Sequence, residues 1–271
     1  MNMTDDGRVR IRHLEVDIVK GCNLKYKFCT HVSPFRKGYI PLEQLSEWFE
    51  TWSKKIAPER FTILGGEPLL HPEVEKVIQI AGKYWKDSQI LFVTNGMILT
   101  KKSHTVFDAL RAVNARVYIS KHFDDPEYNL KFQEAIDCLE QSGIHFQIFH
   151  SHQKWMGVYR IGKTETGQDK PLPFNSDFNL AWKNCIASKK CVSLVNNRLY
   201  RCASIAALQN AYREKAIGKE WEVVDSYQPL SPDCSAYDIF THLNSGAFPK
   251  CSVCPEKFNF IKPEQFKLKA A

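Results

Sequence analysis

The stretch GCNLKYKFCT, residues 21–30, places Cys22 and Cys29 seven positions apart in a loop that follows a short β-branched run. Tyr26 stands between them, four positions after the first cysteine and three before the second. Cysteines at such short spacing are common ligands of metal ions and iron–sulfur clusters. The loop therefore indicates a metal-binding function, and it raises the question of why a tyrosine occupies its middle.

The composition is that of a folded protein. The chain has 271 residues, of which 44% are hydrophobic and 25% charged, a balance typical of a globular α/β domain with a small addition. We expect a cytoplasmic location and no membrane partner, because the sequence has neither a long apolar run nor the apolar segment of a signal peptide. In a reducing compartment, the nine cysteines indicate metal ligands or reactive thiols more than disulfides.

The net charge of +7 is spread over short clusters such as Lys101 with Lys102 and Lys189 with Lys190. These clusters form no basic stripe with interleaved aromatic residues, so nucleic acid is not expected as a partner. The charge indicates an ordinary solvated surface, with an anionic small molecule or an acidic electron-donor protein as the partner.

Strand and helix patterns alternate over the first 150 residues. Short β-branched runs predict strands at 14–19, 61–68, 90–94, 115–120 and 145–150, and apolar residues at helical spacing predict helices at 41–56, 72–86, 104–113 and 126–142. This alternation predicts a parallel sheet with right-handed crossovers. Ligands of such sheets bind at the carboxyl ends of the strands, the positions of Cys22, Gly65, Asn95, Ser120 and His150.

The composition changes after residue 150. Residues 151–184 form a polar stretch with several glycines and prolines, and six of the nine cysteines follow it. We therefore predict a first domain over residues 1–155, its last strand and connection extending at most to about 184, and a second domain over residues 185–271.

Two further motifs give the loop a family resemblance. GGEP at residues 65–68 ends the second predicted strand, and TNG at residues 94–96 ends the third. With the cysteine loop, these motifs resemble the radical S-adenosylmethionine (SAM) enzyme superfamily. The motifs cover about residues 14–150, and the resemblance extends to the rest by cysteine spacing.

In that superfamily, three cysteines of a C-x3-C-x2-C loop hold a 4Fe-4S cluster, and SAM binds the iron left open. The resemblance therefore implies an α/β fold, a partial (β/α)6 TIM-like barrel with SAM and a 4Fe-4S cluster as cofactors. By position, it assigns Cys22, Tyr26 and Cys29 to the metal, and Phe28, Gly65, Gly66, Glu67, Pro68, Asn95 and Ser120 to SAM.

Tyr26 departs from this pattern because it replaces the middle cysteine. Three interpretations remain open: a phenolate as third iron ligand, a cluster held by two cysteines and an outside group such as His31, or a damaged site. Tyrosine ligates haem iron, but thiolate suits an iron–sulfur cluster better. We favour a natural or introduced variant that keeps the SAM-site architecture with a weakened or altered cluster.

A second group of cysteines lies near the carboxyl end. Residues 192–195 and 198–201 are strand-like around Asn196 and Asn197, which tolerate the positive φ of a two-residue turn. Pairing of Val195 with Arg198 would place Cys191 opposite Cys202. Further on, Cys251 and Cys254 form a C-x2-C pair, and Cys185 is a fifth candidate ligand.

This arrangement resembles the twitch domain, the short relative of the SPASM domain, and its layout is most similar to 2-deoxy-scyllo-inosamine dehydrogenases. The resemblance implies one auxiliary 4Fe-4S cluster bound by Cys202, Cys251, Cys254 and either Cys185 or Cys191. Structural zinc is the alternative, since tetrahedral thiolate sites suit both metals.

The resemblance implies a radical SAM enzyme. We expect an oxidoreductase that abstracts a hydrogen atom from a small polyol, aminocyclitol or sugar-like substrate and oxidises an alcohol to a ketone, with flavodoxin or ferredoxin as the reducing partner. One alternative is a maturase that modifies a ribosomally made peptide. The other is a SAM- or cluster-binding protein whose radical activity is impaired by Tyr26.

Overall fold

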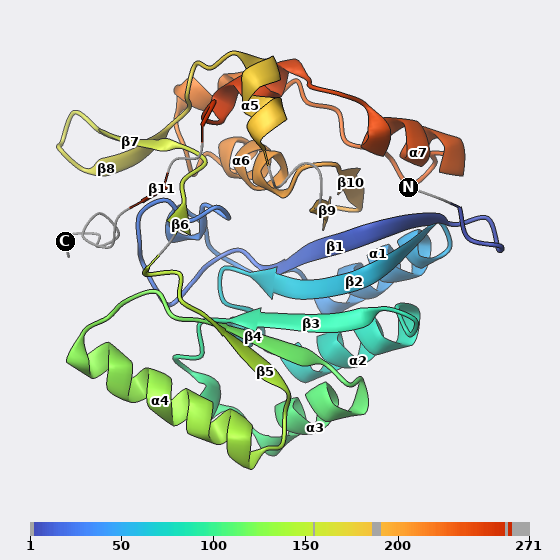
Figure 1. The fold of residues 1–271 in the computed structure, drawn as a ribbon, viewed down its shortest axis with the longest axis vertical. Coiled ribbons are helices and arrows are strands. Elements are labelled where there is room, and N and C mark those ends of the chain that lie inside the picture. Colours follow the sequence, from blue (N-terminus) through green and yellow to red (C-terminus); the bar gives the residue numbers. More distant parts are fainter. Residues whose placement is uncertain (1–2, 154, 186–190, 258–259, 262–271) are drawn as a thin grey trace.

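The structure, a computed structural model, describes residues 3–153, 155–185, 191–257 and 260–261. Its first part supplies five neighbouring parallel strands: β1 (Val9–Val19), β2 (Ile56–Gly65), β3 (Gln89–Thr94), β4 (Arg116–Ser120) and β5 (Phe146–Phe149). They belong to a seven-stranded sheet, completed by β9 (Val192–Val195) and β10 (Arg198–Tyr200), in the order β10-β9-β1-β2-β3-β4-β5 (Figure 1).

Helices connect these parallel strands: α1 (Leu42–Ser53), α2 (Val74–Tyr84), α3 (His104–Ala112) and α4 (Pro126–Gln141). They cover one face of the sheet, and α2 packs between α1 and α3 (Figure 1). Alternation along β1 buries Leu14, Val16 and Ile18 completely on this side, where they meet the buried Phe49 and Trp52 of α1. The predicted α/β fold of barrel type is therefore confirmed.

The sixth parallel strand comes from the far part of the chain. Strand β9 lies parallel to β1, and β10 turns back antiparallel to β9. The predicted pairing of Val195 with Arg198 is confirmed, and Asn196 and Asn197 have φ of 50° and 54°. The partial barrel thus consists of five consecutive β/α strands extended at the β1 edge, where the hairpin is added.

The stretch after β5, for which the sequence predicts a polar connection, contains regular elements of its own: β6 (Trp155–Met156), β7 (Arg160–Lys163), β8 (Asp169–Leu172) and α5 (Phe178–Asn184). Strands β7 and β8 form an antiparallel hairpin, and β6 pairs with β11 (Phe260–Ile261). Sequence patterns missed these strands because each has only two to four residues, too few for a recognisable apolar period.

The carboxyl part adds α6 (Ala203–Arg213) and α7 (Ala236–Asn244). Short 3-10 turns lie at Ser33–Phe35, Pro68–Leu70, Leu99–Lys101, Lys219–Val224 and Pro249–Val253. A second hydrophobic cluster joins this part to the cysteine loop, since Tyr26, Phe28 and Val32 pack in one group with residues of α6 and with Trp221. The predicted division near residues 155–185 stays a prediction.

Within the described ranges, the helices are all too short or too polar to cross a bilayer.

Candidate functional site

The carboxyl ends of β1 and β2 are in direct backbone contact. The Gly66 N–H donates to the Val19 carbonyl at 2.8 Å, and the Glu67 N–H donates to the Gly21 carbonyl at 3.0 Å. A Cβ atom on Gly66 would lie 1.9 Å from the Gly21 oxygen, so only glycine permits this approach. The GGEP motif thus fixes the residue that precedes Cys22.

Glu67 joins the GGEP turn to the end of β3. Its side chain is fully buried; Oε1 accepts from the Leu69 N–H at 3.0 Å and the Thr94 hydroxyl at 2.7 Å, and Oε2 accepts from the Asn95 N–H at 2.8 Å. Burial raises the pKa of this carboxyl to about 7. Both oxygens are engaged within the protein, and a contact with the SAM amino group stays a prediction.

Asn95 links the third strand end to the cysteine loop. Its Nδ2 donates to Asn23 Oδ1 at 2.8 Å and to Cys22 Sγ at 3.6 Å, while the Leu24 N–H donates to the same sulfur at 3.4 Å. Burial raises the pKa of the Cys22 thiol to about 12. Strand ends predicted to lie together from the sequence do so, and two donors already point at the first cysteine sulfur.

Tyr26 is packed as a core aromatic residue. It is 7% exposed, its ring stacks on His122 with centroids 4.5 Å apart, and Trp155 meets it edge-on at 6.0 Å. Its hydroxyl hydrogen-bonds the Cys29 side chain, and burial raises its pKa well above the usual value. Tyr26 therefore brings a phenol oxygen to Cys29 while its ring fills an aromatic pocket.

The segment after β5 donates hydrogen bonds to the end of the cysteine loop. The Trp155 indole N–H donates to the Phe28 carbonyl at 2.9 Å, and the Tyr159 hydroxyl donates to the Cys29 carbonyl at 3.2 Å. Phe28 has a φ of 65°, in the left-handed region, and its ring stacks on Tyr159. Tyr159 is fully buried, although it lies in the stretch 151–184 that the sequence predicts to be a polar connection.

His122 lies just beyond Ser120 at the end of β4. The Ser120 carbonyl accepts from the Tyr128 hydroxyl at 3.4 Å. His122 is 7% exposed, and within the described ranges its Nδ1 has no hydrogen-bond partner. Burial lowers its pKa to about 4. Sequence reasoning missed this neutral imidazole beside Tyr26, because nothing in the local spacing of the chain links the two residues.

His31, the proposed outside ligand, forms an ion pair with Asp17 of β1. Nδ1 of His31 is 3.1 Å from Asp17 Oδ1. Burial opposes the charge on His31, but the carboxylate outweighs it and raises the pKa of His31 to about 9. An imidazolium held in this way is a poor iron ligand, because a metal requires the neutral ring.

Four thiols of the carboxyl part lie together. Cys185, Cys202 and Cys254 line one cavity. Burial first, and then the neighbouring thiols of Cys202, Cys185 and Cys251, raise the pKa of Cys254 well above the usual value. Cys191 instead has its Sγ 3.7 Å from His13 Nδ1. Of the two residues left open by the sequence, Cys185 is the one that shares the cavity.

Four cysteine thiols can bind either a zinc ion or an iron–sulfur cluster, and the two differ in the spacing of the sulfurs. Tetrahedral zinc, with Zn–S bonds of about 2.3 Å, needs sulfur pairs about 3.8 Å apart. Among the residues that the structure describes, no three of these thiols lie within 4.8 Å of one another. The spacing of the described thiols is therefore wider than one tetrahedral zinc ion requires, and an iron–sulfur cluster at this place stays a prediction. The Cys22 loop offers two thiols and a phenol to a cluster.

Comparison with known proteins identifies the first part of the chain. Residues 16–142 match the model of the Radical SAM superfamily. GTP 3',8-cyclases from Aliarcobacter butzleri and Aquifex aeolicus are 29% and 28% identical over 111 and 127 residues. These matches cover 39% and 45% of this chain, but only 34% and 38% of the relatives. The chain thus spans little more than a third of the length of these curated proteins.

Solved structures with a similar arrangement include BtrN in complex with AdoMet and 2-DOIA, which is 14% identical, with 90% of this chain and 91% of that chain covered and a TM-score of 0.49. Native anSMEcpe with bound AdoMet and a peptide is 20% identical, with 51% and 42% covered and a TM-score of 0.41.

The family model and the curated relatives show that residues 16–142 form a radical SAM superfamily domain, homologous to enzymes. This superfamily uses SAM and a 4Fe-4S cluster. The resemblance drawn from the cysteine loop and GGEP is confirmed at that level.

Proposed function

We propose that the chain is a radical SAM enzyme that takes a hydrogen atom from a small substrate rich in hydroxyl or amino groups. The observation that carries the proposal is the convergence of three strand ends, in which the Glu67 N–H donates to the Gly21 carbonyl and the Asn95 amide donates to the Cys22 sulfur. This convergence lies inside the segment that matches the superfamily.

The chain's own residues orient the cysteine loop. The Asn95 amide and the Leu24 N–H donate to the Cys22 sulfur, and such donors stabilise a thiolate over a thiol. A 4Fe-4S cluster with SAM, held at this loop, would supply the acceptor for the substrate's hydrogen atom, with flavodoxin or ferredoxin as the one-electron donor. The buried aromatic residues around Tyr26 exclude water from this end of the sheet.

The substrate class is supported by the polar residues near the loop. The side chains of Asp17 and His31 are 11% and 24% exposed, so they are partly accessible beside Cys29. A carboxylate and an imidazolium suit hydroxyl or ammonium groups better than apolar carbon. A polyol, aminocyclitol or sugar-like substrate therefore agrees with the site better than an apolar one.

We further propose that Cys185, Cys202, Cys251 and Cys254 hold an auxiliary 4Fe-4S cluster in a twitch-like domain. Oxidation of a secondary alcohol to a ketone releases one hydrogen atom, one proton and one electron. The hydrogen atom would go to the 5'-deoxyadenosyl group, and a saturated auxiliary cluster would accept the electron. The cavity lined by Cys185, Cys202 and Cys254, with the Cys251 thiol as a further neighbour of Cys254, supports this role.

The test is anaerobic reconstitution followed by iron counting and an assay for 5'-deoxyadenosine with SAM and reductant. Incubation with polyols and aminocyclitols deuterated at the carbinol carbon should place deuterium in 5'-deoxyadenosine, with one ketone per turnover. Deuterium retained in the product, or formation of a C–S or C–C bond, would overturn the dehydrogenase activity. A peptide substrate that supports turnover where polyols fail would support the maturase alternative instead.

A second candidate function is a SAM- or cluster-binding protein without radical activity. The burial of Tyr26 between His122 and Trp155 favours it, because the third ligand position is built into the core as an aromatic residue. This candidate predicts that SAM binds to the unaltered chain but no 5'-deoxyadenosine forms.

A further inference from the structure

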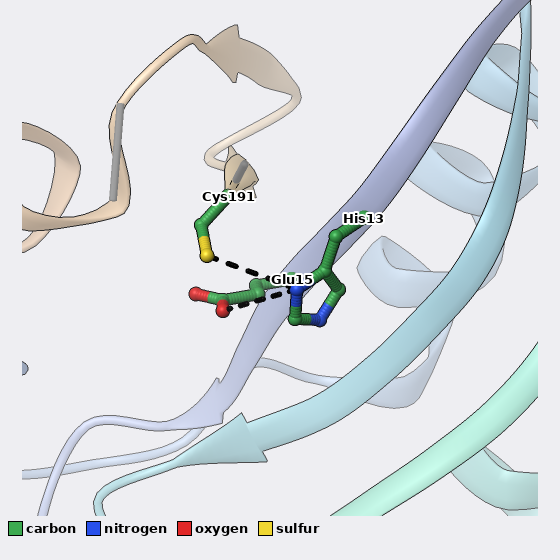
Figure 2. A group of neighbouring side chains, drawn as sticks. All are labelled: His13, Glu15 and Cys191. Atoms are coloured by element: carbon green, nitrogen blue, oxygen red, sulfur yellow. Dashed lines mark hydrogen bonds and ion pairs between the residues drawn. The ribbon is translucent and has the colours of Figure 1, made fainter. Parts of the chain in front are cut away.

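A separate group of potential metal ligands lies between β1 and the start of β9. His13 and Glu15 are two positions apart on β1, so their side chains point to the same face of the sheet. Cys191 immediately precedes β9, whose first residue, Val192, pairs with Leu14. Figure 2 shows the three side chains converging, and their ligand atoms all lie within 4.8 Å of one another.

The distances in this group are close to those of a metal site. His13 Nδ1 lies 3.7 Å from Cys191 Sγ and 3.8 Å from Glu15 Oε1 (Figure 2). Ligands on a tetrahedral zinc-like ion, with bonds of about 2.0–2.3 Å, are separated by about 3.3–3.6 Å. A shift of a few tenths of an ångström would therefore bring the His13 nitrogen to the distances from Cys191 and Glu15 that ligands of one metal ion have.

The opposite side of the imidazole is already oriented. His13 Nε2 and the Thr62 hydroxyl are 2.6 Å apart, and Thr62 is 1% exposed on the neighbouring strand β2. A hydrogen bond at the second ring nitrogen is the usual way in which proteins fix the tautomer of a metal-binding histidine. It leaves Nδ1 directed at Glu15 and Cys191.

The charges in this group also call for a cation. The Glu15 side chain is 14% exposed, and Asp17, which follows on the same face of the strand, is already paired with His31. Within the described ranges, no lysine or arginine forms an ion pair with Glu15. Metal binding would displace the thiol proton, and a divalent ion would balance the two negative charges.

We propose that His13, Glu15 and Cys191 bind one divalent transition-metal ion of the zinc class. The mixture of nitrogen, oxygen and sulfur donors excludes magnesium and calcium, which take oxygen ligands. Three protein ligands leave a coordination position for water or an oxygen of an external ligand, as in catalytic rather than structural zinc sites. The proposal does not depend on the radical SAM reaction or on the cavity lined by Cys185, Cys202 and Cys254.

The first experiment reads the protection of Cys191 from alkylation in the full chain, after anaerobic iron–sulfur reconstitution, with Zn²⁺ or Mg²⁺ added. Trypsin cleavage at Lys190 and Arg198 gives the peptide CVSLVNNR, whose only cysteine is Cys191, whereas Cys185 falls in NCIASK. At a Zn²⁺ concentration about ten times Kd, mass action leaves about a tenth of the site free, so labelling of Cys191 should slow about tenfold. Mg²⁺ should give no protection.

Variants then identify the other ligands. His13→Gln and Glu15→Gln should each abolish the Zn²⁺ protection of Cys191, and Thr62→Val should raise the Kd about tenfold or more. Glu43→Gln, an exposed carboxylate of α1, is the matched control and should leave protection unchanged. Full thermal stability without metal shows that each variant is folded.

The proposal is overturned if Zn²⁺ leaves the labelling of Cys191 in the unaltered chain unchanged, a result that needs no variant. It is equally overturned if protection persists in both His13→Gln and Glu15→Gln, because Cys191 would then bind metal with the other thiols. Neither result bears on 5'-deoxyadenosine formation, so this proposal and the proposed function can fail separately.

Discussion

Replacement of Tyr26 by cysteine separates the packing role of this residue from its role at the cluster. The ring stacks on His122 and meets Trp155 edge-on, and aromatic pairs contribute about 0.5–1.5 kcal/mol each beyond buried area. Removing a buried aromatic side chain costs about 3–5 kcal/mol when alanine replaces it. A thiol fills part of that space, so Tyr26→Cys should destabilise the cluster-free protein by about 2–4 kcal/mol.

The effect on metal binding should have the opposite sign. The new thiolate would complete a C-x3-C-x2-C set with Cys22 and Cys29, and thiolate is the softer ligand. Tyr26→Cys should therefore raise iron content and 5'-deoxyadenosine formation after reconstitution, although the cluster-free chain is less stable. Tyr26→Phe is the matched control, because it keeps the ring and removes only the hydroxyl bonded to Cys29; it should cost about 1 kcal/mol.

Urea unfolding of the cluster-free proteins measures the first effect, and iron counting with the 5'-deoxyadenosine assay measures the second. Unchanged urea stability in Tyr26→Cys would refute the packing argument. Equal activity with tyrosine and cysteine would refute the interpretation of a damaged site. Higher activity with tyrosine, lost in Tyr26→Phe, would support phenolate ligation.

Three other outcomes follow from single residues. Gly66→Ala should destabilise the protein by about 3 kcal/mol or more, measured by urea unfolding, because its Cβ would lie 1.9 Å from a backbone oxygen. Burial, with a nearby guanidinium, lowers the pKa of His242 from 6.5 to about 4, so its contribution to stability is present above pH 6.5 and lost as the pH falls through 4. After allowance for solvent screening this is about 1–2 kcal/mol; His242→Gln should flatten the urea stability curve between pH 7 and 4, and the exposed His104→Gln should not. Cys202→Ser should remove the iron of one cluster and lower the melting temperature of the reconstituted protein, whereas Cys138→Ser on α4 should retain full iron.

The sequence by itself determined the order of strands and helices from β1 to β5. Apolar residues recur at helical spacing in α1, at Leu45, Trp48, Phe49 and Trp52, and these are the residues that the structure buries. The apolar periodicity of each segment and the order of the segments along the chain are enough for this prediction. Two parallel strands need a crossover connection, and its right-handedness determines on which side the next strand is added. The superfamily also followed from the sequence, since the loop and GGEP are contiguous motifs at strand ends.

Contacts between distant segments were decided only by the tertiary structure. No local pattern indicates that β9 pairs with β1, which directs the Cys191 thiol toward His13 and leaves Cys185 in the cavity with Cys202 and Cys254. The surroundings of Tyr26 have the same origin, because His122 and Trp155 are about 100 residues or more away in the chain. Spacing along a sequence reports which side chains share one face of one element, whereas ligand sets and aromatic pockets depend on which elements pack together.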